Sequence, residues 1–324
     1  MLEKYINAAA KRSKADIVLK NARFVNTLTG KIQAGDIAIC GDRIVGIGSY
    51  EGQREYDMSG LTVLPGFIDS HVHIESSMLS PEEYAALVVP RGTTSVIADP
   101  HEITNVCGMD GVEYIYKASQ SVPLDVHIQL PSCVPATPFE TSGAILSGDD
   151  IAVGICRSEV FGLGEFMNFP GVIGADGDVI KKLEAAHRAG KIIDGHAPCV
   201  TGDELNAYLC GGISTDHECA TPEEMEVKAD AGVYVQLRHS SSIHDIAANC
   251  KAVNGGNMRR FLMCTDDRHA ADLRTKGHID DALRTVVAAG LDPVWAVTIV
   301  TLNAAQCYNL KWRGGIAPFY LADL

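Results

Sequence analysis

Short apolar runs alternate with longer amphipathic segments along most of the chain after residue 65. The apolar runs are rich in Val, Ile and Leu and have the length of strands that are buried on both faces. We expect eight strands, within residues 66–73, 93–101, 124–132, 159–167, 191–198, 211–218, 232–239 and 260–269. This alternation predicts an α/β fold, here a (β/α)8 TIM-like barrel, with a doubly wound open sheet as the alternative.

Helix start and stop signals fall between most of these strands. Ser80 is a suitable N-cap, Pro81 fits the first turn, and Glu83 stands three residues after the cap. Four later segments end in glycine, as helices often do. They cover residues 177–190, 202–212, 221–232 and 277–290.

The first 64 residues have a different pattern of apolar and polar positions. Residues 1–15 predict a short polar helix. Three apolar pieces separated by Gly, Asp and Asn then predict a small antiparallel unit. They cover residues 15–26, 35–48 and 60–66. We therefore expect two domains, an incomplete β-rich domain over residues 1–64 and a barrel domain over residues 65–324.

Composition narrows the classes of function. The chain has 324 residues, 46% of them hydrophobic, and a net charge of −14. Nucleic-acid binding needs clustered Lys and Arg, so the acidic balance argues against that role. The ten cysteines form no CxxC pair, which indicates reduced thiols. Without an apolar run of membrane-spanning length or a signal segment, we expect a cytoplasmic protein with no membrane association.

Histidines and carboxylates gather at the ends of the expected strands. His71 and His73 end the first strand, and residues i and i+2 of a strand point to the same face. In a β/α barrel the C-terminal ends of the strands meet at one mouth, where the chemistry takes place. The polar residues that end the other strands are Asp99, His101, Glu102, Glu165, His196, Asp216, His217, Glu218, Arg238, His239, Asp266 and Asp267.

Each of these residues alone has a simpler interpretation. A single His at a strand end is often a hydrogen-bonded loop residue. A carboxylate after a strand often caps the next helix, as Asp99, Glu218 and Asp267 would. The combination is the stronger signal, because imidazole and carboxylate ligands together suit Zn, Mn and Fe. We therefore expect a metal site at the mouth of the barrel.

Seven stretches resemble one known family. They are "VLPGFIDSHVHIESSML", "GTTSVIADPHEITNVCG", "GLGEFMNFPGV", "DGHAP", "TDHE", "CTDDRHAADLRTKGHID" and "TLNAAQCYNL". HxH after the first strand, a carboxylate after the fourth, His after the fifth and sixth, and Asp after the eighth resemble the amidohydrolase superfamily. Within this superfamily, the amino-acid sequence of the stretches is similar to that of the bacterial adenine deaminases, and the resemblance covers most of the chain.

The resemblance implies a binuclear metal centre. Six residues would hold two divalent transition metals, with Mn or Fe favoured and Zn as the alternative. They are His71, His73 and Asp266 for one metal, His196 and His217 for the other, and Glu165 as a bridge beside a bridging hydroxide.

The implied reaction is the hydrolytic deamination of adenine to hypoxanthine and ammonia, so the expected partner is a small-molecule purine. Asp266 would take a proton from the attacking hydroxide and pass it to the leaving nitrogen. Glu102 and His101 are further catalytic candidates, for proton handling or purine contacts. Arg238 and His239 are candidates for substrate binding.

The sequence also departs from that family. Phe319 and Leu321 stand where Gly and Arg are expected, and His239 in "RHSSS" stands where an acid is expected. Family members are longer, so we expect a truncated or divergent product whose exposed strand edges favour a homo-oligomer. The alternatives are another amidohydrolase that acts on a cyclic amide or an N-acetyl substrate, or a truncated non-catalytic chain.

Overall fold

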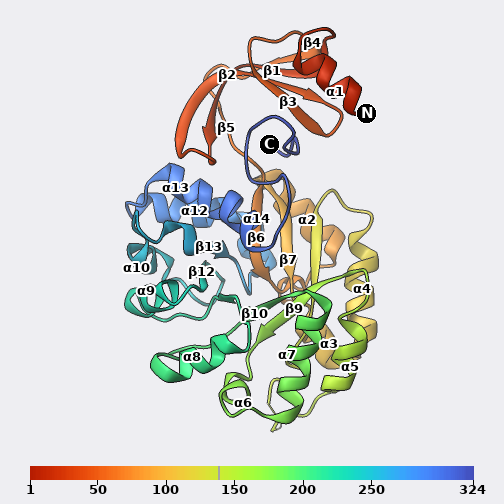
Figure 1. Ribbon diagram of the computed structural model, residues 1–324, viewed down its shortest axis with the longest axis vertical. Helices are drawn as coiled ribbons and strands as arrows, with labels where there is room; N and C mark the ends of the chain where they lie inside the picture. The colour runs from red at the N-terminus through yellow and green to blue at the C-terminus, as the bar shows by residue number, and fades with distance from the viewer. Residues whose placement is uncertain (138) are drawn as a thin grey trace. The chain divides into compact units, whose positions relative to one another are not determined.

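The computed structural model describes residues 1–137 and 139–324, which pack as two compact units (Figure 1). One unit comprises Met1–Ile68 together with Asp292–Leu324, and the other comprises Asp69–Leu291. The packing therefore groups the last segment of the chain with the N-terminal residues. The domain boundary expected between residues 64 and 65 stays a prediction.

The first unit contains a five-stranded sheet. The strands of the sheet are β1 (Ala15–Asn26), β2 (Lys31–Cys40), β3 (Arg43–Gly48), β4 (Gly52–Asp57) and β5 (Thr62–Val63). The unit also contains α1 (Leu2–Ala9), α13 (Pro293–Thr298), the π-helical turn η5 (Ile299–Asn303) and α14 (Ala304–Cys307). The strand order is β3-β2-β1-β4, and β5 also pairs with β1.

Strand directions in this sheet are mixed. β2 is antiparallel to β1 and to β3, whereas β4 and β5 run parallel to β1. The expectation of a purely antiparallel unit was therefore wrong. Because β1 and β3 both flank the antiparallel β2, they run in the same direction, and β4 keeps that direction after β3.

Both segments of the chain contribute to the core of this unit. The hydroxyl of Thr27 donates a hydrogen bond of 2.6 Å to the carbonyl of Gly314, and Arg43 forms an antiparallel bridge with Leu321. One buried cluster joins residues from both segments. It consists of Ala22, Phe24, Ile37, Ile39, Ile44 and Ile316. The C-terminal segment thus supplies part of the hydrophobic surface that a small sheet needs for stability.

In its described residues the second unit carries eight strands, each inside one of the eight predicted ranges. They are β6 (Phe67–Val72), which starts at the boundary between the units, β7 (Thr93–Ala98), β8 (Asp125–Leu130), β9 (Val160–Phe166), β10 (Ile192–Gly195), β11 (Thr215–Asp216), β12 (Tyr234–Arg238) and β13 (Phe261–Cys264). The hydrophobic pattern was sufficient here because strands buried on both faces read as continuous apolar runs.

Helices and short turns fill the intervals between these strands. The α-helices are α2 (Pro81–Val88), α3 (His101–Cys107), α4 (Met109–Ser119), α5 (Gly148–Gly154), α6 (Phe169–Ile173), α7 (Gly177–Ala189), α8 (Gly202–Cys210), α9 (Pro222–Asp230), α10 (Ile246–Asn249), α11 (Ala270–Thr275) and α12 (Ile279–Ala288). The 3-10 turns are η1 (Ile74–Ser77), η2 (Val89–Arg91), η3 (Cys250–Ala252) and η4 (Met258–Arg260). The Ser80 cap of α2 is confirmed, since its side chain accepts the backbone N–H of Glu83.

The eight strands form two sheets whose ends meet. The first has the order β10-β9-β8-β7-β6 and the second the order β11-β12-β13. On one side Val72 forms a parallel bridge with Asp266, and the N–H of Asp266 donates a hydrogen bond of 3.0 Å to the carbonyl of His71. On the other side the N–H of Ser214 donates a hydrogen bond of 3.0 Å to the carbonyl of Ile193. These contacts favour the barrel over the open sheet, and the α/β fold is the one expected.

The helices pack onto the outside of the larger sheet through one buried apolar cluster. Its members include Val72, Tyr84, Val88, Val96, Ile115, Ile128, Ile151, Leu163, Leu183 and Leu205. The rigid strands therefore present their C-terminal ends at fixed positions. Among the residues that the structure describes, no helix is both long enough and apolar enough to cross a membrane.

Candidate metal centre

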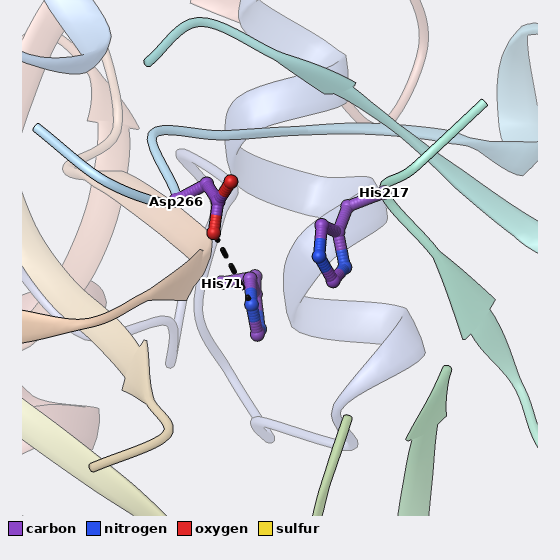
Figure 2. Close-up of side chains that lie close together, drawn as sticks. All are labelled: His71, His217 and Asp266. Carbon is purple, nitrogen blue, oxygen red and sulfur yellow. Dashed lines mark ion pairs between the residues drawn. The ribbon is translucent and has the colours of Figure 1, made fainter. Parts of the chain in front are cut away.

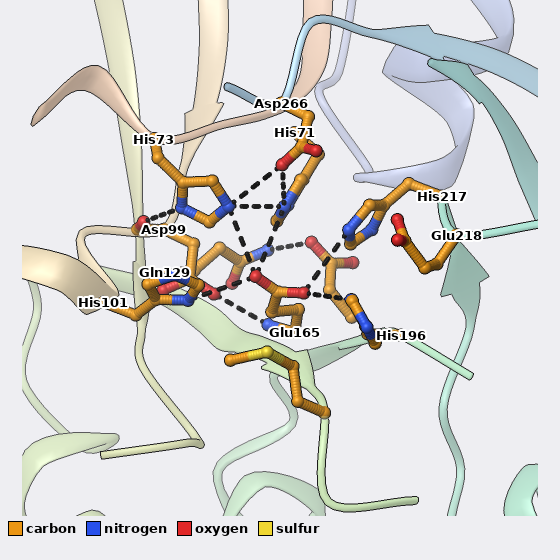
Figure 3. Close-up of polar contacts among 12 residues, drawn as sticks. His71, His73, Asp99, His101, Gln129, Glu165, His196, His217, Glu218 and Asp266 are labelled. Atoms are coloured by element: carbon orange, nitrogen blue, oxygen red, sulfur yellow. Dashed lines mark hydrogen bonds and ion pairs between the residues drawn. The ribbon is translucent and has the colours of Figure 1, made fainter. Parts of the chain in front are cut away.

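The polar strand ends predicted from the sequence meet at one place (Figure 3). Seven of the candidates face one another there, each carried by the end of a strand, by the turn that follows it or, for His101, by the first residue of α3. They are His71, His73, His101, Glu165, His196, His217 and Asp266. Apart from His101 and His196, their side chains are at most 9% exposed.

His71 and His73 point to the same side of β6, as the spacing predicted. Their Nε2 atoms lie 3.1 Å apart. Oδ1 of Asp266 lies 3.2 Å from Nε2 of His73 and 3.7 Å from Nε2 of His71. Figure 2 shows His71 between Asp266 and His217, whose ring stacks on it with the centroids 4.0 Å apart. The first and last strands thus supply three donor atoms to one point.

Glu165 stands at the centre of the cluster. Its Oε1 lies 3.3 Å from Nε2 of His73 and 3.1 Å from Nδ1 of His101. Its Oε2 lies 2.7 Å from Nδ1 of His196 and 3.4 Å from Nε2 of His217. The two oxygens therefore face two different sets of histidines, which is the arrangement that a bridging carboxylate requires.

The backbone around Glu165 is tied to neighbouring strand ends. The N–H of Glu165 donates a hydrogen bond of 2.8 Å to Oδ2 of Asp99, and the carbonyl of Glu165 accepts one of 2.5 Å from the hydroxyl of Ser132. The carbonyl of Asp99 lies 2.6 Å from Nδ1 of His73. A single residue, Asp99, thus orients both the Glu165 backbone and the His73 ring, and the remaining ring nitrogen of His73 faces the cluster.

The arrangement of the donor atoms is better explained by metal binding than by hydrogen bonds among these side chains. Nδ1 of His196, Nδ1 of His101 and Oε2 of Glu165 are buried without a hydrogen-bond partner, although His196 and Glu165 approach within 2.7 Å. Buried polar atoms in proteins are nearly always paired, so short contacts without hydrogen-bond geometry are expected of ligands aimed at a common ion. Neutral imidazole and carboxylate suit divalent Mn, Fe or Zn.

The pKa shifts place part of the cluster in the forms that bind metals. Burial, together with the rings of His217 and His73, holds the pKa of His71 well below its usual range, so this ring is neutral. Burial alone would raise the pKa of Glu165, but the imidazoles of His101, His196 and His217 hold it well below its usual range. Neutral histidines and ionised carboxylates are the forms that bind metals. Burial lowers the pKa of His217, but Glu165 and Asp266 raise it to about 9, and Glu102, Asp266 and Glu165 likewise raise the pKa of His73. Metal binding would therefore displace a proton from each of these two rings.

Comparison with known proteins identifies the family. Residues 62–324 match the amidohydrolase family. The chain belongs to this family. The adenine deaminase of Clostridium acetobutylicum is 49% identical over 323 residues, which are 100% of this chain and 57% of that protein. Adenine deaminase 2 of Desulfotalea psychrophila is also 49% identical, over 100% of this chain and 56% of its own length. The amidohydrolase thus spans little more than half the length of the curated relatives it matches.

Solved structures of low sequence identity share its fold. An enamidase is 18% identical with a TM-score of 0.69, and the alignment covers 96% of this chain and 86% of that one. The N-acetyl-D-glucosamine-6-phosphate deacetylase of Mycobacterium smegmatis is 18% identical with a TM-score of 0.68, covering 94% and 93%. At this level of identity the likeness concerns the fold alone.

Glu102 and Arg238 border the cluster of this amidohydrolase. Oε1 of Glu102 lies 3.2 Å from Nε2 of His101 and accepts the hydroxyl of Ser76 at 3.0 Å. Nη1 of Arg238 lies 2.9 Å from Oδ2 of Asp266 and also contacts the carboxylate of Glu218. Arg238 is therefore next to the candidate ligand Asp266, and Oε2 of Glu102 lies 3.6 Å from Nδ1 of the candidate ligand His73. The roles expected of both residues stay predictions.

The side chain of His239 contacts α12 and not the cluster. Its Nε2 lies 3.0 Å from Oδ2 of Asp281 on α12, and its ring contacts that of His244. Burial and the charge of Arg268 lower the pKa of His239 despite the neighbouring Asp281. The expected role of His239 in substrate binding stays a prediction.

Two buried residues that support the cluster had been given no role from the sequence. Asp69 accepts the N–H of Thr265 at 3.0 Å and its hydroxyl at 2.5 Å, next to Asp266. Lys228 on α9 donates to the side chain of Asp216, next to His217, at 2.7 Å. Asp69 had one available signal, a carboxylate inside an apolar strand two residues before HxH. Lys228 resembled an ordinary helical surface charge.

Proposed function

We propose that the chain catalyses the hydrolytic deamination of adenine to hypoxanthine and ammonia. The observation that carries the proposal is the meeting of six residues at the strand ends, with the two oxygens of Glu165 facing separate histidines. These are His71, His73, Glu165, His196, His217 and Asp266. The identity of 49% to proteins named adenine deaminase supports the choice of substrate.

The six residues would hold two divalent transition metals. His71, His73 and Asp266 form one set and His196 and His217 the other, with Glu165 between them. Mn or Fe is the favoured metal and Zn the alternative, because every proposed ligand is an imidazole or a carboxylate. When bound, such a pair lowers the pKa of water and so supplies a hydroxide near neutral pH.

Asp266 is the residue that moves protons. Water attacks C6 of adenine, forming a C–O bond, and the bond from C6 to the exocyclic nitrogen breaks. Asp266 takes a proton from the attacking oxygen and delivers it to that nitrogen, which leaves as ammonia. Arg238 holds Oδ2 of Asp266 at 2.9 Å, so Oδ1 keeps its orientation toward the cluster.

His101 and Glu102 act together beside the purine. The ring of His101 lies between Oε1 of Glu165 and Oε1 of Glu102, at 3.1 and 3.2 Å. The side chain of Glu102 is 40% exposed, so it is accessible from solvent. This pair can donate or accept a proton at a ring nitrogen of the base. Arg238 borders the proposed substrate pocket, and His239 is kept as a proposed substrate contact although its Nε2 contacts Asp281 and not the cluster.

The proposal includes a setting for the enzyme. Its partner is a free purine base, it works in the cytoplasm, and it assembles as a homo-oligomer. The edge strand β4, which is mostly exposed, favours such an association.

A panel of substrates tests this function. The chain is loaded with Mn or Fe and offered adenine, a six-membered cyclic amide and an N-acetyl amino sugar. We expect release of ammonia from adenine and no hydrolysis of the other two. Hydrolysis of the cyclic amide or the acetyl group with no attack on adenine would identify another amidohydrolase. No turnover of any substrate by the metal-loaded chain would indicate a non-catalytic protein.

A further inference from the structure

The ammonium group of Lys228 is buried between two loops that carry candidate ligands. Lys228 lies on α9, one turn after Glu224, and the structure leaves its side chain with no exposed surface. The side chain of Thr221 caps the helix by accepting the N–H of Glu224. Residues i and i+4 share one face of a helix, so Glu224 and Lys228 point together into the protein.

All three hydrogens of the ammonium have an acceptor. Nζ lies 2.6 Å from the carbonyl of Ala197, 2.7 Å from Oδ2 of Asp216 and 2.6 Å from Oε1 of Glu224. A lysine ammonium has three donors, so its hydrogen-bonding capacity is filled. The three acceptors come from three different elements, and the position of the nitrogen is fixed by all of them at once.

Two of these acceptors adjoin candidate ligands. Ala197 follows His196 at the end of β10, and Asp216 precedes His217 at the end of β11. The Asp216 side chain also accepts the N–H of Glu218 at 2.8 Å, which fixes the turn around His217. Lys228 therefore connects the backbone next to one imidazole with the side chain next to the other.

Glu224 strengthens the same connection. Its Oε1 accepts the N–H of Cys199 at 2.7 Å, and its Oε2 accepts the N–H of Ala220 at 2.9 Å. Cys199 lies in the loop after β10 and Ala220 in the loop after β11. The carboxylate and the ammonium thus hold the same two loops together from neighbouring points.

General stability is a poor explanation for this arrangement. Burying charged groups costs much of what their attraction gains, and well-packed apolar side chains often serve a fold equally well. The feature that apolar side chains would not reproduce is the directional connection between the two loops. Residues beyond the direct ligands commonly change metal affinity by about 10- to 100-fold when they are removed.

We propose that Lys228 is a positioning residue for one half of the metal centre. By connecting Ala197 with Asp216 it holds His196 and His217 at the distances at which both reach Oε2 of Glu165, 2.7 and 3.4 Å. His71, His73 and Asp266 come from other strands and do not depend on it. The inference rests on the proposed two-metal centre, although not on adenine as the substrate.

The test is the metal content of Lys228→Met, which keeps the length of the side chain and removes its charge. Wild-type and variant chains are loaded with Mn, freed of excess metal by gel filtration, and analysed by elemental mass spectrometry and electron paramagnetic resonance. We expect two metals in the wild type and one in the variant, with affinity for the second weakened by about 10- to 100-fold. The spectrum of a coupled pair should give way to that of a single Mn, matching His217→Ala and not His71→Ala.

Two controls separate positioning from destabilisation. Ile115→Ala removes a side chain that is buried in α4, remote from the cluster in the fold, and should keep two metals although the fold is weakened. Lys228→Met combined with Glu224→Gln leaves the buried group with the same net charge as in the wild type, which favours folding if the single variant does not fold. This double variant should also retain one metal.

The other outcomes would overturn the inference, the proposed centre or the proposed reaction. Two metals bound with unchanged affinity in both Lys228 variants would show that the connection is dispensable. Loss of both metals together, or loss of one in Ile115→Ala as well, would show an effect of general stability. Fewer than two metals in the wild type would overturn the proposed centre itself. A wild type that binds two metals and leaves adenine unchanged would overturn only the proposed reaction.

Discussion

Arg238 lies 2.9 Å from Oδ2 of Asp266, on the other side of the carboxylate from His73, which lies 3.2 Å from Oδ1. One oxygen of Asp266 is thus held by a guanidinium while the other faces the candidate metal ligands. Burial would raise the pKa of Asp266, but His73 and His217 outweigh it, and the pKa is lowered. Arg238, predicted from the sequence as a substrate contact, is therefore also positioned to orient the proposed catalytic carboxylate.

The first prediction concerns Arg238→Met. Loss of a charge-assisted hydrogen bond is worth about 1.5–3 kcal/mol, so we expect kcat to fall by about 10- to 100-fold. The KM for adenine should change little if the main role of Arg238 is to orient Asp266. Steady-state kinetics at matched metal content distinguish the roles. A large rise in KM with kcat preserved would assign Arg238 to the substrate alone.

The second prediction concerns Asp266→Asn. An amide cannot take the proton from the attacking water, so turnover should fall by at least about 100-fold while the fold is retained. Circular dichroism and thermal unfolding check the fold. Asp149→Asn is the matched control, because the Asp149 side chain is 83% exposed on α5, and it should leave turnover unchanged. Turnover near that of the wild type in Asp266→Asn would remove this residue from the mechanism.

The third prediction concerns Asp69, which is fully buried and joins the first strand to the last. Its carboxylate accepts two hydrogen bonds from Thr265 and one of 3.3 Å from the N–H of His71. Asp69→Asn replaces one acceptor oxygen by a donor that faces the N–H of Thr265, or the Thr265 hydroxyl and Nε2 of His278, which lies 2.9 Å from Oδ2. We expect a loss of about 2–4 kcal/mol in the free energy of unfolding, measured with urea, because buried donors lose an acceptor.

Thr265→Val is the control for that loss. It removes the hydroxyl and keeps the N–H bond to Asp69, so it should cost about 1 kcal/mol. Equal stability of Asp69→Asn and the wild type would show that the link between the strands contributes little.

The fourth prediction concerns the pH dependence of stability in the unit formed by Met1–Ile68 and Asp292–Leu324. Burial would raise the pKa of Asp36, but Lys20 at 2.5 Å and the N–H groups of Tyr50 and Asn21 at 3.1 Å lower it below the ordinary value of 3.8. The ionised carboxylate therefore stabilises the fold above pH 3.8. This contribution decreases as the pH falls below 3.8 and through the lowered pKa.

Asp36→Asn removes the titrating group. Its stability should be about 2 kcal/mol below that of the wild type at pH 7, and the difference should shrink as the pH falls below 4. Both tryptophans of the chain, Trp295 and Trp312, belong to the same unit, so their fluorescence reports its unfolding in urea. A difference that stays constant from pH 7 to pH 3 would contradict the assignment to ionised Asp36.

The strand ends were predictable because the pattern that marks a buried strand also marks where it stops. His71 and His73 share a face by the alternation of a strand, and the barrel brings Glu165, His196 and Asp266 to the same mouth. These predictions needed only local pattern and one rule of architecture.

Other features depend on contacts between distant segments. Asp69 and Thr265 are 196 residues apart, and Thr27 and Gly314 are 287 apart, so no local pattern indicates either pair. Lys228 follows Glu224 at the spacing of an exposed helical ion pair, and its burial becomes visible only in the fold. The same alternation that paired His71 with His73 separates neighbouring side chains, which is why Arg238 and His239 contact different elements.

The most direct test of the central claim compares wild-type chain with Asp266→Asn at equal Mn content in the presence of adenine. The ultraviolet spectrum and released ammonia are followed over time. We predict that the wild type converts adenine to hypoxanthine with one ammonia per base, and that the variant leaves nearly all adenine unchanged. A metal-loaded wild type that leaves adenine intact, or a variant that converts it at the same rate, would contradict the account.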